Sequence, residues 1–193
     1  MKLYLLRHGI TEANEKRLYC GWSDIPLSKD GKAQLELIHK QALYPDIEGL
    51  KVYTSGMRRT EETLHIIYGD VPHEVIDDFK EMNFGDFEMK SYEELKSTPD
   101  YQAWLSGCNE RNICPGGESG EDMKARALRG LKQLIAKNDD CLVVCHGGII
   151  ACIMEELFPS YKRNRYQWQP EGGKGYVIIL SQGIPEEFEQ IPY

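Results

Sequence analysis

The sequence lacks the patterns that mark disulfide-linked, zinc-binding and membrane-spanning proteins. No two of its six cysteines form a C-x-x-C pair, the spacing typical of zinc sites. No segment approaches the roughly 20 apolar residues that a membrane-spanning helix needs. Arg7 comes before any apolar stretch long enough for a signal sequence. A chain of 193 residues can build a core without disulfides. We therefore expect a cytoplasmic protein with free thiols and no membrane contact.

The chain also lacks an excess of positive charge. Its formal net charge is −8 at pH 7, whereas general nucleic-acid binders need a basic surface that releases counterions. This balance argues against nucleic acid as a partner, but a few arginines in a cleft can still attract a small anion. The metallohydrolase patterns H-x-H and H-E-x-x-H do not occur. We expect no metal and no other cofactor, and the sequence does not indicate an oligomeric state.

Short apolar runs alternate with longer amphipathic stretches along the chain. Strands are predicted at residues 3–6, 52–54, 75–76, 141–145 and 176–180. Helices are predicted at 29–42, 57–68, 119–137 and 149–158, with two short ones between 91 and 105. This alternation favours an α/β fold, a three-layer α/β/α sandwich with a mostly parallel central sheet. One domain is expected over residues 1–193, with a small helical cap around 89–114.

Three of the predicted strands run into residues that can bind an anion. The first strand is followed by Arg7 and His8. The second is followed by Arg58 and Arg59, and the fourth by His146. Ligands of parallel α/β sheets bind beyond the carboxyl ends of the strands. If these strands are parallel, the two histidines and the arginines gather at one edge of the sheet.

Histidines and arginines in one cluster suit phosphoryl transfer without a metal. The arginine guanidinium matches phosphate oxygens and keeps its charge. Neutral histidine is a nucleophile near neutral pH, because its ring titrates at about 6.5. Gly9, Gly147 and Gly148 let backbone N–H groups approach an anion at helix starts. In such a site, arginines and a second histidine stabilise the charge that magnesium neutralises in other enzymes.

Four sequence blocks resemble the motifs of one known family. Residues 6–14, LRHGITEAN, are similar to the R-H-G-x-[ST]-x-x-N signature of the histidine phosphatase superfamily, which includes the cofactor-dependent phosphoglycerate mutases. Residues 54–63 resemble its second block, 80–88 its third, and 144–148, VCHGG, its fourth. The blocks occur in the order that the family has. The resemblance implies a phosphoglycerate mutase-like fold and a phosphatase that works through a phosphohistidine.

The resemblance also implies roles for individual residues. His8 would attack phosphorus, while Glu81 would protonate the leaving oxygen and then activate the hydrolytic water. The oxygens of the transferring phosphoryl group would be held by Arg7, Arg59 and His146. Residues implied in substrate binding are Asn14, Thr11, Gly21 and Gly147.

The resemblance leaves alternatives to a phosphatase. Mutases of the family carry a long insertion after the third block, but here only a short segment separates Glu88 from Pro115. Hydrolysis is therefore favoured over mutase-type transfer. A non-catalytic phospho-ligand-binding module on the same fold would usually lack a catalytic histidine or arginine, and this chain keeps them. The expected partner is a small phosphorylated metabolite. The chain resembles small bacterial phosphatases such as α-ribazole phosphatase, so α-ribazole 5′-phosphate is the favoured substrate.

The surroundings of the predicted site carry aromatic and basic residues. The aromatic side chains Tyr92, Tyr101, Trp104 and Trp22 either pack the cap onto the sheet or stack on a flat leaving group. Both interpretations stay open at this point. The basic segment 162–165 is interpreted as a solvated patch near the carbonyl end of the preceding helix.

Overall fold

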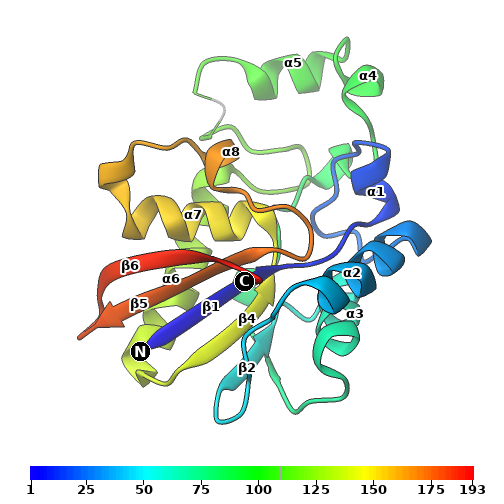
Figure 1. Ribbon diagram of the computed structural model, residues 1–193. Helices are drawn as coiled ribbons and strands as arrows, with labels where there is room; N and C mark the ends of the chain where they lie inside the picture. Colours follow the sequence, from blue (N-terminus) through cyan, green and yellow to red (C-terminus); the bar gives the residue numbers. More distant parts are fainter. Residues whose placement is uncertain (109) are drawn as a thin grey trace.

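The computed structural model describes residues 1–108 and 110–193, and within these ranges its centre is a sheet of six strands (Figure 1). The strands lie in the order β3-β2-β4-β1-β5-β6. The parallel strands are β1 (Lys2–Arg7), β2 (Lys51–Thr54), β3 (Glu74–Val75) and β4 (Cys141–Cys145). The antiparallel strands are β5 (Gly175–Ser181) and β6 (Ile184–Ile191).

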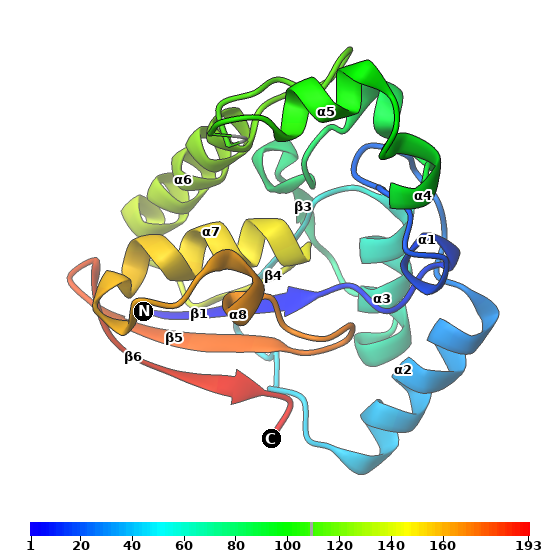
Figure 2. The same cartoon turned by 90° about the horizontal axis from the view of Figure 1, so that it is seen from above.

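Helices cover both faces of this sheet (Figure 2). The covering helices are α2 (Lys29–Gln41) and α3 (Arg58–Tyr68) on one face, and α6 (Gly120–Lys137) and α7 (Gly147–Leu157) on the other. Successive side chains of a strand point to opposite faces. Accordingly, Leu3 and Leu5 of β1 pack in the core on the α6 and α7 side, whereas Tyr4 and Leu6 pack on the α2 and α3 side. The predicted three-layer fold with a mostly parallel sheet is confirmed.

Shorter helices lie around the carboxyl ends of the strands. They are α1 (Glu12–Glu15), α4 (Tyr92–Leu95), α5 (Pro99–Leu105) and α8 (Arg165–Trp168). The predicted cap at 89–114 contains α4 and α5, which Figure 1 shows beside the loop of α1, and its residue 109 lies outside the described residues. In the part of the chain that the structure describes, no helix has the length and apolar character to cross a bilayer.

The structure adds a strand that the sequence analysis did not predict. β6 is an edge strand that contains Pro185 and several glutamates, so its apolar pattern is weak. The turn before it places Gln182 and Gly183 at positive φ angles of 52° and 79°. Two consecutive residues at positive φ form the type of turn that joins antiparallel hairpin strands. The hairpin therefore depends on backbone geometry more than on hydrophobic periodicity.

Candidate active site

Neighbouring parallel strands bring the predicted catalytic residues together. β2, β4 and β1 are adjacent in the sheet, and Arg59, His146 and His8 lie just beyond their carboxyl ends. The ring centroids of His8 and His146 are 5.1 Å apart. The Nε atom of Arg59 donates a hydrogen bond to His146 Nδ1 over 3.3 Å. The structure thus gathers at one sheet edge three residues that are far apart in the sequence, as the topology predicted.

His8 is buried and held in one orientation. Its side chain is 5 % exposed, and its Nδ1 atom lies 2.6 Å from the carbonyl oxygen of Gly9. A carbonyl can only accept, so Nδ1 carries the hydrogen and Nε2 keeps its lone pair. Burial, together with the positive charges of Arg59 and Arg7, lowers the pKa of His8 well below its ordinary value. The ring is therefore a neutral imidazole with a nucleophilic Nε2.

His146 lies behind His8 in a directional chain of hydrogen bonds. Because its Nδ1 accepts from Arg59, its Nε2 bears the hydrogen and donates to Ser55 Oγ over 2.8 Å. The Ser55 hydroxyl contacts Thr60 Oγ1 at 3.2 Å, and Thr60 donates to the carbonyl of Met57 at 2.7 Å. Burial and the neighbouring Arg59 charge lower the pKa of His146. This series of hydrogen bonds keeps His146 neutral and fixes its ring plane.

Arg59 is fixed by the loop that follows α1. Its NH1 and NH2 groups donate to the carbonyls of Ser23 and Gly21 at 2.9 and 2.6 Å. The Glu88 carboxylate holds this loop, accepting N–H groups from Gly21 at 3.0 Å, Trp22 at 2.9 Å and Ser23 at 3.2 Å. A Cβ at position 21 would lie 1.5 Å from a main-chain oxygen, so only glycine fits. Glu88, to which the sequence analysis gave no role, thus positions Arg59 through the loop.

A cavity of about 340 Å³ opens at His8. Of the predicted site residues, Arg7, Asn14 and Glu81 also line it. Arg7 NH1 donates to the carbonyl of Pro170 over 2.7 Å. Burial lowers the pKa of the Arg7 guanidinium, as it does for the second arginine of the site. A phosphate that enters the cavity would offset these two positive charges.

Glu81 reaches the cavity at the start of α7. Its Oε2 atom accepts the N–H of Gly148 over 2.9 Å, so the carboxylate lies at the positive end of the helix dipole. A Cβ at position 148 would come within 2.4 Å of Glu81 Oε1. The glycine therefore lets the carboxylate approach the helix start.

The remaining predicted site residues are outside the cavity lining. Arg59, His146, Thr11, Gly21 and Gly147 do not line the cavity within the described chain. Thr11 caps α1, and its N–H and hydroxyl both donate to the side-chain oxygen of Asn14 at 3.0 Å. Thr11 therefore positions Asn14, whose side-chain NH₂ group remains a donor. Direct contacts of Thr11, Gly21 and Gly147 with substrate stay predictions.

The lining of the cavity also includes an aromatic wall. The aromatic residues that line it are Tyr19, Phe84, Trp104 and Tyr166. Trp104 is 9 % exposed and also packs against Tyr101 and Phe87. Its side chain therefore both packs the cap and lines the cavity, so both interpretations of the cap aromatics apply to it. Tyr92 and Trp22 are about half exposed and do not line the cavity in the described chain.

Arg165 overturns part of the interpretation of segment 162–165 as a solvated patch. It begins α8, lines the cavity, and its NH2 group donates to Glu110 Oε2 over 2.7 Å. After α7 the chain returns to the cavity, which Tyr166 and Gln169 also line, and a local charge pattern does not indicate this return. Neither Arg165 nor Glu110 carried a signal in the sequence that could have placed it at the site.

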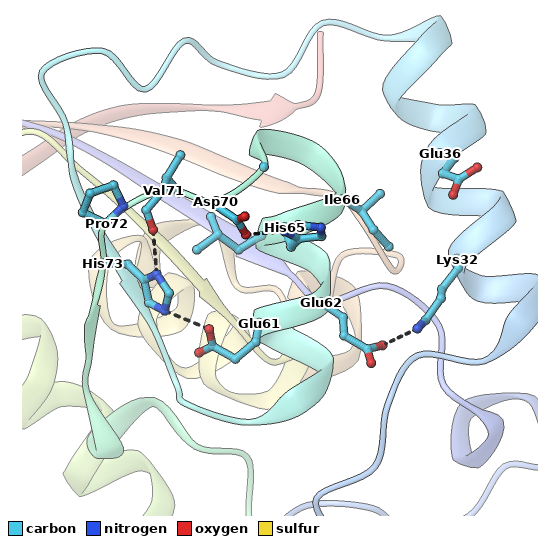
Figure 3. Close-up of a pocket in the computed structure, with 12 residues that line it drawn as sticks. Lys32, Glu36, Glu61, Glu62, His65, Ile66, Asp70, Val71, Pro72 and His73 are labelled. Atoms are coloured by element: carbon cyan, nitrogen blue, oxygen red, sulfur yellow. Dashed lines mark hydrogen bonds and ion pairs between the residues drawn. The ribbon is translucent and has the colours of Figure 1, made fainter.

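A second, larger hollow has none of the predicted site residues in its described lining. It measures about 620 Å³ and lies between α2 and α3 (Figure 3). Its charged groups pair with one another, as Lys32 does with Glu62 at 3.0 Å and His73 with Glu61 at 2.8 Å. Outside residue 109, no group of three or more His, Cys, Asp or Glu side chains is arranged to hold a metal ion. The cavity at His8 is therefore the candidate active site, although it is smaller than the hollow between α2 and α3.

Comparisons with known proteins agree over most of the chain. The family model described as Histidine phosphatase superfamily (branch 1) matches residues 3–180. The adenosylcobalamin/alpha-ribazole phosphatase of Salmonella typhimurium is 29 % identical over 191 residues, covering 95 % of this chain and 93 % of that protein. The protein named Probable phosphoglycerate mutase GpmB from Serratia proteamaculans is 30 % identical over 175 residues, covering 86 % and 79 %. The crystal structure of the alpha-ribazole phosphatase from Shigella flexneri has a TM-score of 0.81 at 27 % identity, covering 96 % and 93 %.

Proposed function

This chain belongs to the histidine phosphatase superfamily and is a phosphatase, and we propose that it hydrolyses a small phosphomonoester through a phosphohistidine at His8. The observation that carries the proposal is the state of His8. It is a buried, neutral imidazole whose Nδ1 is bound to a carbonyl and whose Nε2 has no hydrogen-bond partner among the described residues. The ring lies at the wall of a cavity that Arg7 and Glu81 also line. Such an arrangement suits covalent catalysis at phosphorus.

The first chemical step transfers the phosphoryl group to His8. The Nε2 lone pair attacks phosphorus while the bond to the ester oxygen breaks, and protonated Glu81 gives its proton to that oxygen. Arg7 and Asn14 donate to the oxygens of the transferring group from the cavity wall, and the Arg59 charge lies behind them. The alcohol leaves, and Glu81 remains as a carboxylate.

The second step releases phosphate. The Glu81 carboxylate takes a proton from water as the water oxygen attacks phosphorus. The bond from phosphorus to Nε2 breaks, and its electron pair returns to the His8 ring. Inorganic phosphate leaves, which restores the neutral histidine and the protonated acid.

The favoured substrate is α-ribazole 5′-phosphate. The aromatic wall supports a flat leaving group, and several relatives carry alpha-ribazole phosphatase names. One stacked ring is worth about 1–3 kcal/mol by analogy with base–aromatic stacking, or about 5- to 150-fold in specificity. A triose phosphate offers no ring and gains none of this.

A comparison of three substrates on one preparation tests this proposal. We expect kcat/KM to be higher for α-ribazole 5′-phosphate than for 3-phosphoglycerate, with a nucleoside monophosphate between them. Tyr166→Ala removes a lining ring that is 83 % exposed, so it should lower kcat/KM only for the ring-bearing substrates. Tyr161→Ala, an exposed tyrosine outside the lining, is the control. A preference for 3-phosphoglycerate, or no preference, would reject stacking and leave a broad-specificity phosphatase. Conversion of 3-phosphoglycerate to 2-phosphoglycerate would instead indicate a mutase.

A further inference from the structure

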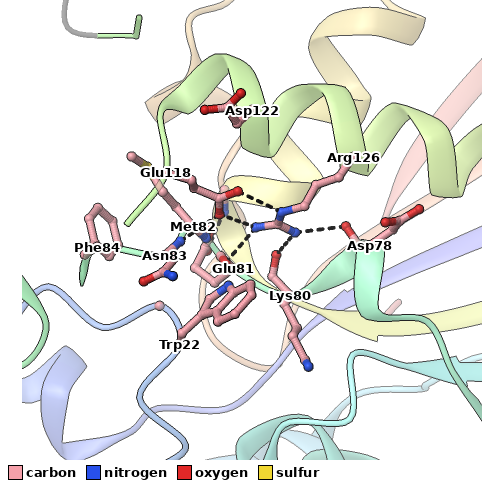
Figure 4. A network of polar contacts seen from close by, with 12 residues as sticks. Trp22, Asp78, Lys80, Glu81, Met82, Asn83, Phe84, Glu118, Asp122 and Arg126 are labelled. Carbon is pink, nitrogen blue, oxygen red and sulfur yellow. Dashed lines mark hydrogen bonds and ion pairs between the residues drawn. The ribbon is translucent and has the colours of Figure 1, made fainter. Parts of the chain in front are cut away.

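Arg126 of α6 directs its whole guanidinium group at two segments beside the active site (Figure 4). Its NH1 group donates to the carbonyls of Asp78, at 3.0 Å, and of Lys80. Its NH2 group donates to the carbonyl of Glu81 at 2.8 Å and to Glu118 Oε1 at 2.7 Å. Its Nε donates to Glu118 Oε2 at 3.1 Å. All five N–H donors of an arginine are therefore used.

Glu118 extends this contact to Asn83, at the other end of the segment 78–83. Its Oε1 atom accepts the N–H of Asn83 at 2.7 Å, and its own N–H donates to the carbonyl of Asn83 at 3.0 Å. The Arg126 and Glu118 side chains are only 11 % and 16 % exposed. Removing two charges from water is costly, and neither side chain lines the cavity in the described chain. The pair thus binds the backbone of the protein itself and lies outside the cavity lining.

The residue at the middle of this network is Glu81. Residues 81–84 form no helix and no strand, so no ladder of backbone hydrogen bonds fixes their path. Arg126 binds the carbonyl of Glu81 from outside the cavity, while the Glu81 carboxylate contacts the helix start inside it. A general acid works only within hydrogen-bond reach of the leaving oxygen, so small displacements of its backbone matter.

From this geometry we propose that Arg126 and Glu118 are positioning residues that hold Glu81 at the leaving-group oxygen. The inference rests on the proposed function, in which Glu81 is the general acid. Loss of this Arg126–Glu118 clamp would leave the nucleophile and the phosphate-binding arginines in place. It would therefore impair protonation of the leaving group more than attack on phosphorus.

The test is the dependence of kcat/KM on leaving-group basicity, from p-nitrophenyl phosphate to an alkyl phosphate. Arg126→Lys keeps the charge but cannot reach all the carbonyls, and Glu118→Gln keeps the shape but removes the charge. We expect both variants to lose about tenfold or more on the alkyl phosphate and only a few-fold on p-nitrophenyl phosphate. Arg129→Lys, on the same helix and paired with the Asp78 side chain, is the control and should keep the wild-type slope.

The outcomes separate the clamp from the proposed function. Equal losses of kcat/KM on every substrate, or a wild-type slope in both variants, would overturn the proposal for the clamp. A merely structural role predicts no change of slope. Glu81→Gln must steepen the slope in the same series; if it does not, the general-acid assignment itself is wrong. If Arg126→Lys fails to fold, by circular dichroism, the slope of Glu118→Gln decides alone.

Discussion

The Nδ1 atom of His8 lies 2.6 Å from the carbonyl oxygen of Gly9, the residue that follows it. This short-range contact settles the tautomer, because a carbonyl cannot donate. Arg7 and Arg59 lie close enough to lower the pKa of the same ring. Together these contacts keep the proposed nucleophile neutral, and they make the protein's stability depend on pH.

The first prediction concerns stability between about pH 7.5 and 5.5. His8 and His146 have folded-state pKa values below their ordinary value of 6.5. As the pH falls below about 6.5, the unfolded chain binds protons that the folded chain does not. Each histidine should therefore remove up to about 1.4 kcal/mol of stability per pH unit. Their stabilising contribution is complete above that pH and is lost below it.

Urea unfolding of the wild type and His8→Asn at several pH values measures this effect. The variant should lose less stability on acidification than the wild type, by up to about 1.4 kcal/mol per pH unit. Parallel curves for the two proteins would show that His8 titrates normally in the folded state. His65→Asn, which replaces an exposed histidine, is the control.

A second prediction concerns Glu81. Glu81→Gln should slow an alkyl phosphate by about 100-fold or more but p-nitrophenyl phosphate far less, because p-nitrophenolate leaves without a proton. Steady-state kinetics on the two substrates measures the difference. Equal losses would point to another acid. Asp86 is the next candidate, although it does not line the cavity in the described chain.

A third prediction concerns metal ions. The proposed chemistry uses the charges of Arg7 and Arg59 in place of a divalent cation. Activity should therefore survive prolonged dialysis against EDTA, measured by phosphate release in metal-free buffer. Activity that is lost on chelation and restored by magnesium or zinc would reject metal-independent catalysis.

A fourth prediction concerns Glu88, whose carboxylate accepts backbone N–H groups of the loop that binds Arg59. Glu88→Gln would turn an NH₂ group toward these donors, which should cost about 1–3 kcal/mol of stability. Because Arg59 loses its support, affinity for inorganic phosphate should also fall by about tenfold, a change of 1.4 kcal/mol.

Calorimetric titration with phosphate measures that affinity. Glu94→Gln is the matched control. Glu94, like Glu88, accepts a backbone N–H, but it does so at the start of α4 and is outside the cavity lining in the described chain. An unchanged phosphate affinity in Glu88→Gln, with only a lower stability, would confine Glu88 to a structural role.

The sequence was sufficient for the layers of the fold and for the gathering of His8, Arg59 and His146. Buried strands such as residues 141–145 are apolar throughout, and the helix predicted at 119–137 matches α6, which begins after its Ser119 cap. Topology then placed the residues after these strands at one edge. These features depend on local pattern, which a single sequence displays.

The supports of the site could not be predicted in the same way. Glu88 contacts a loop 65 to 67 residues away, and Arg126 binds the Glu81 carbonyl across 45 residues. Each is an ordinary charged residue until the fold brings its partner close. Arg165 was misplaced for the same reason, because its pairing with Glu110 spans 55 residues. Long-range polar contacts carry no periodic signal.

The most direct test of the account is chemical trapping of the intermediate at His8. The wild type is mixed briefly with a labelled phosphomonoester, quenched in alkali, digested and analysed by mass spectrometry. We predict an acid-labile phosphate on His8 that forms and decays at rates compatible with turnover, and nearly complete loss of both label and turnover in His8→Ala. A phosphate on another residue, or substantial turnover by His8→Ala, would contradict the phosphohistidine mechanism.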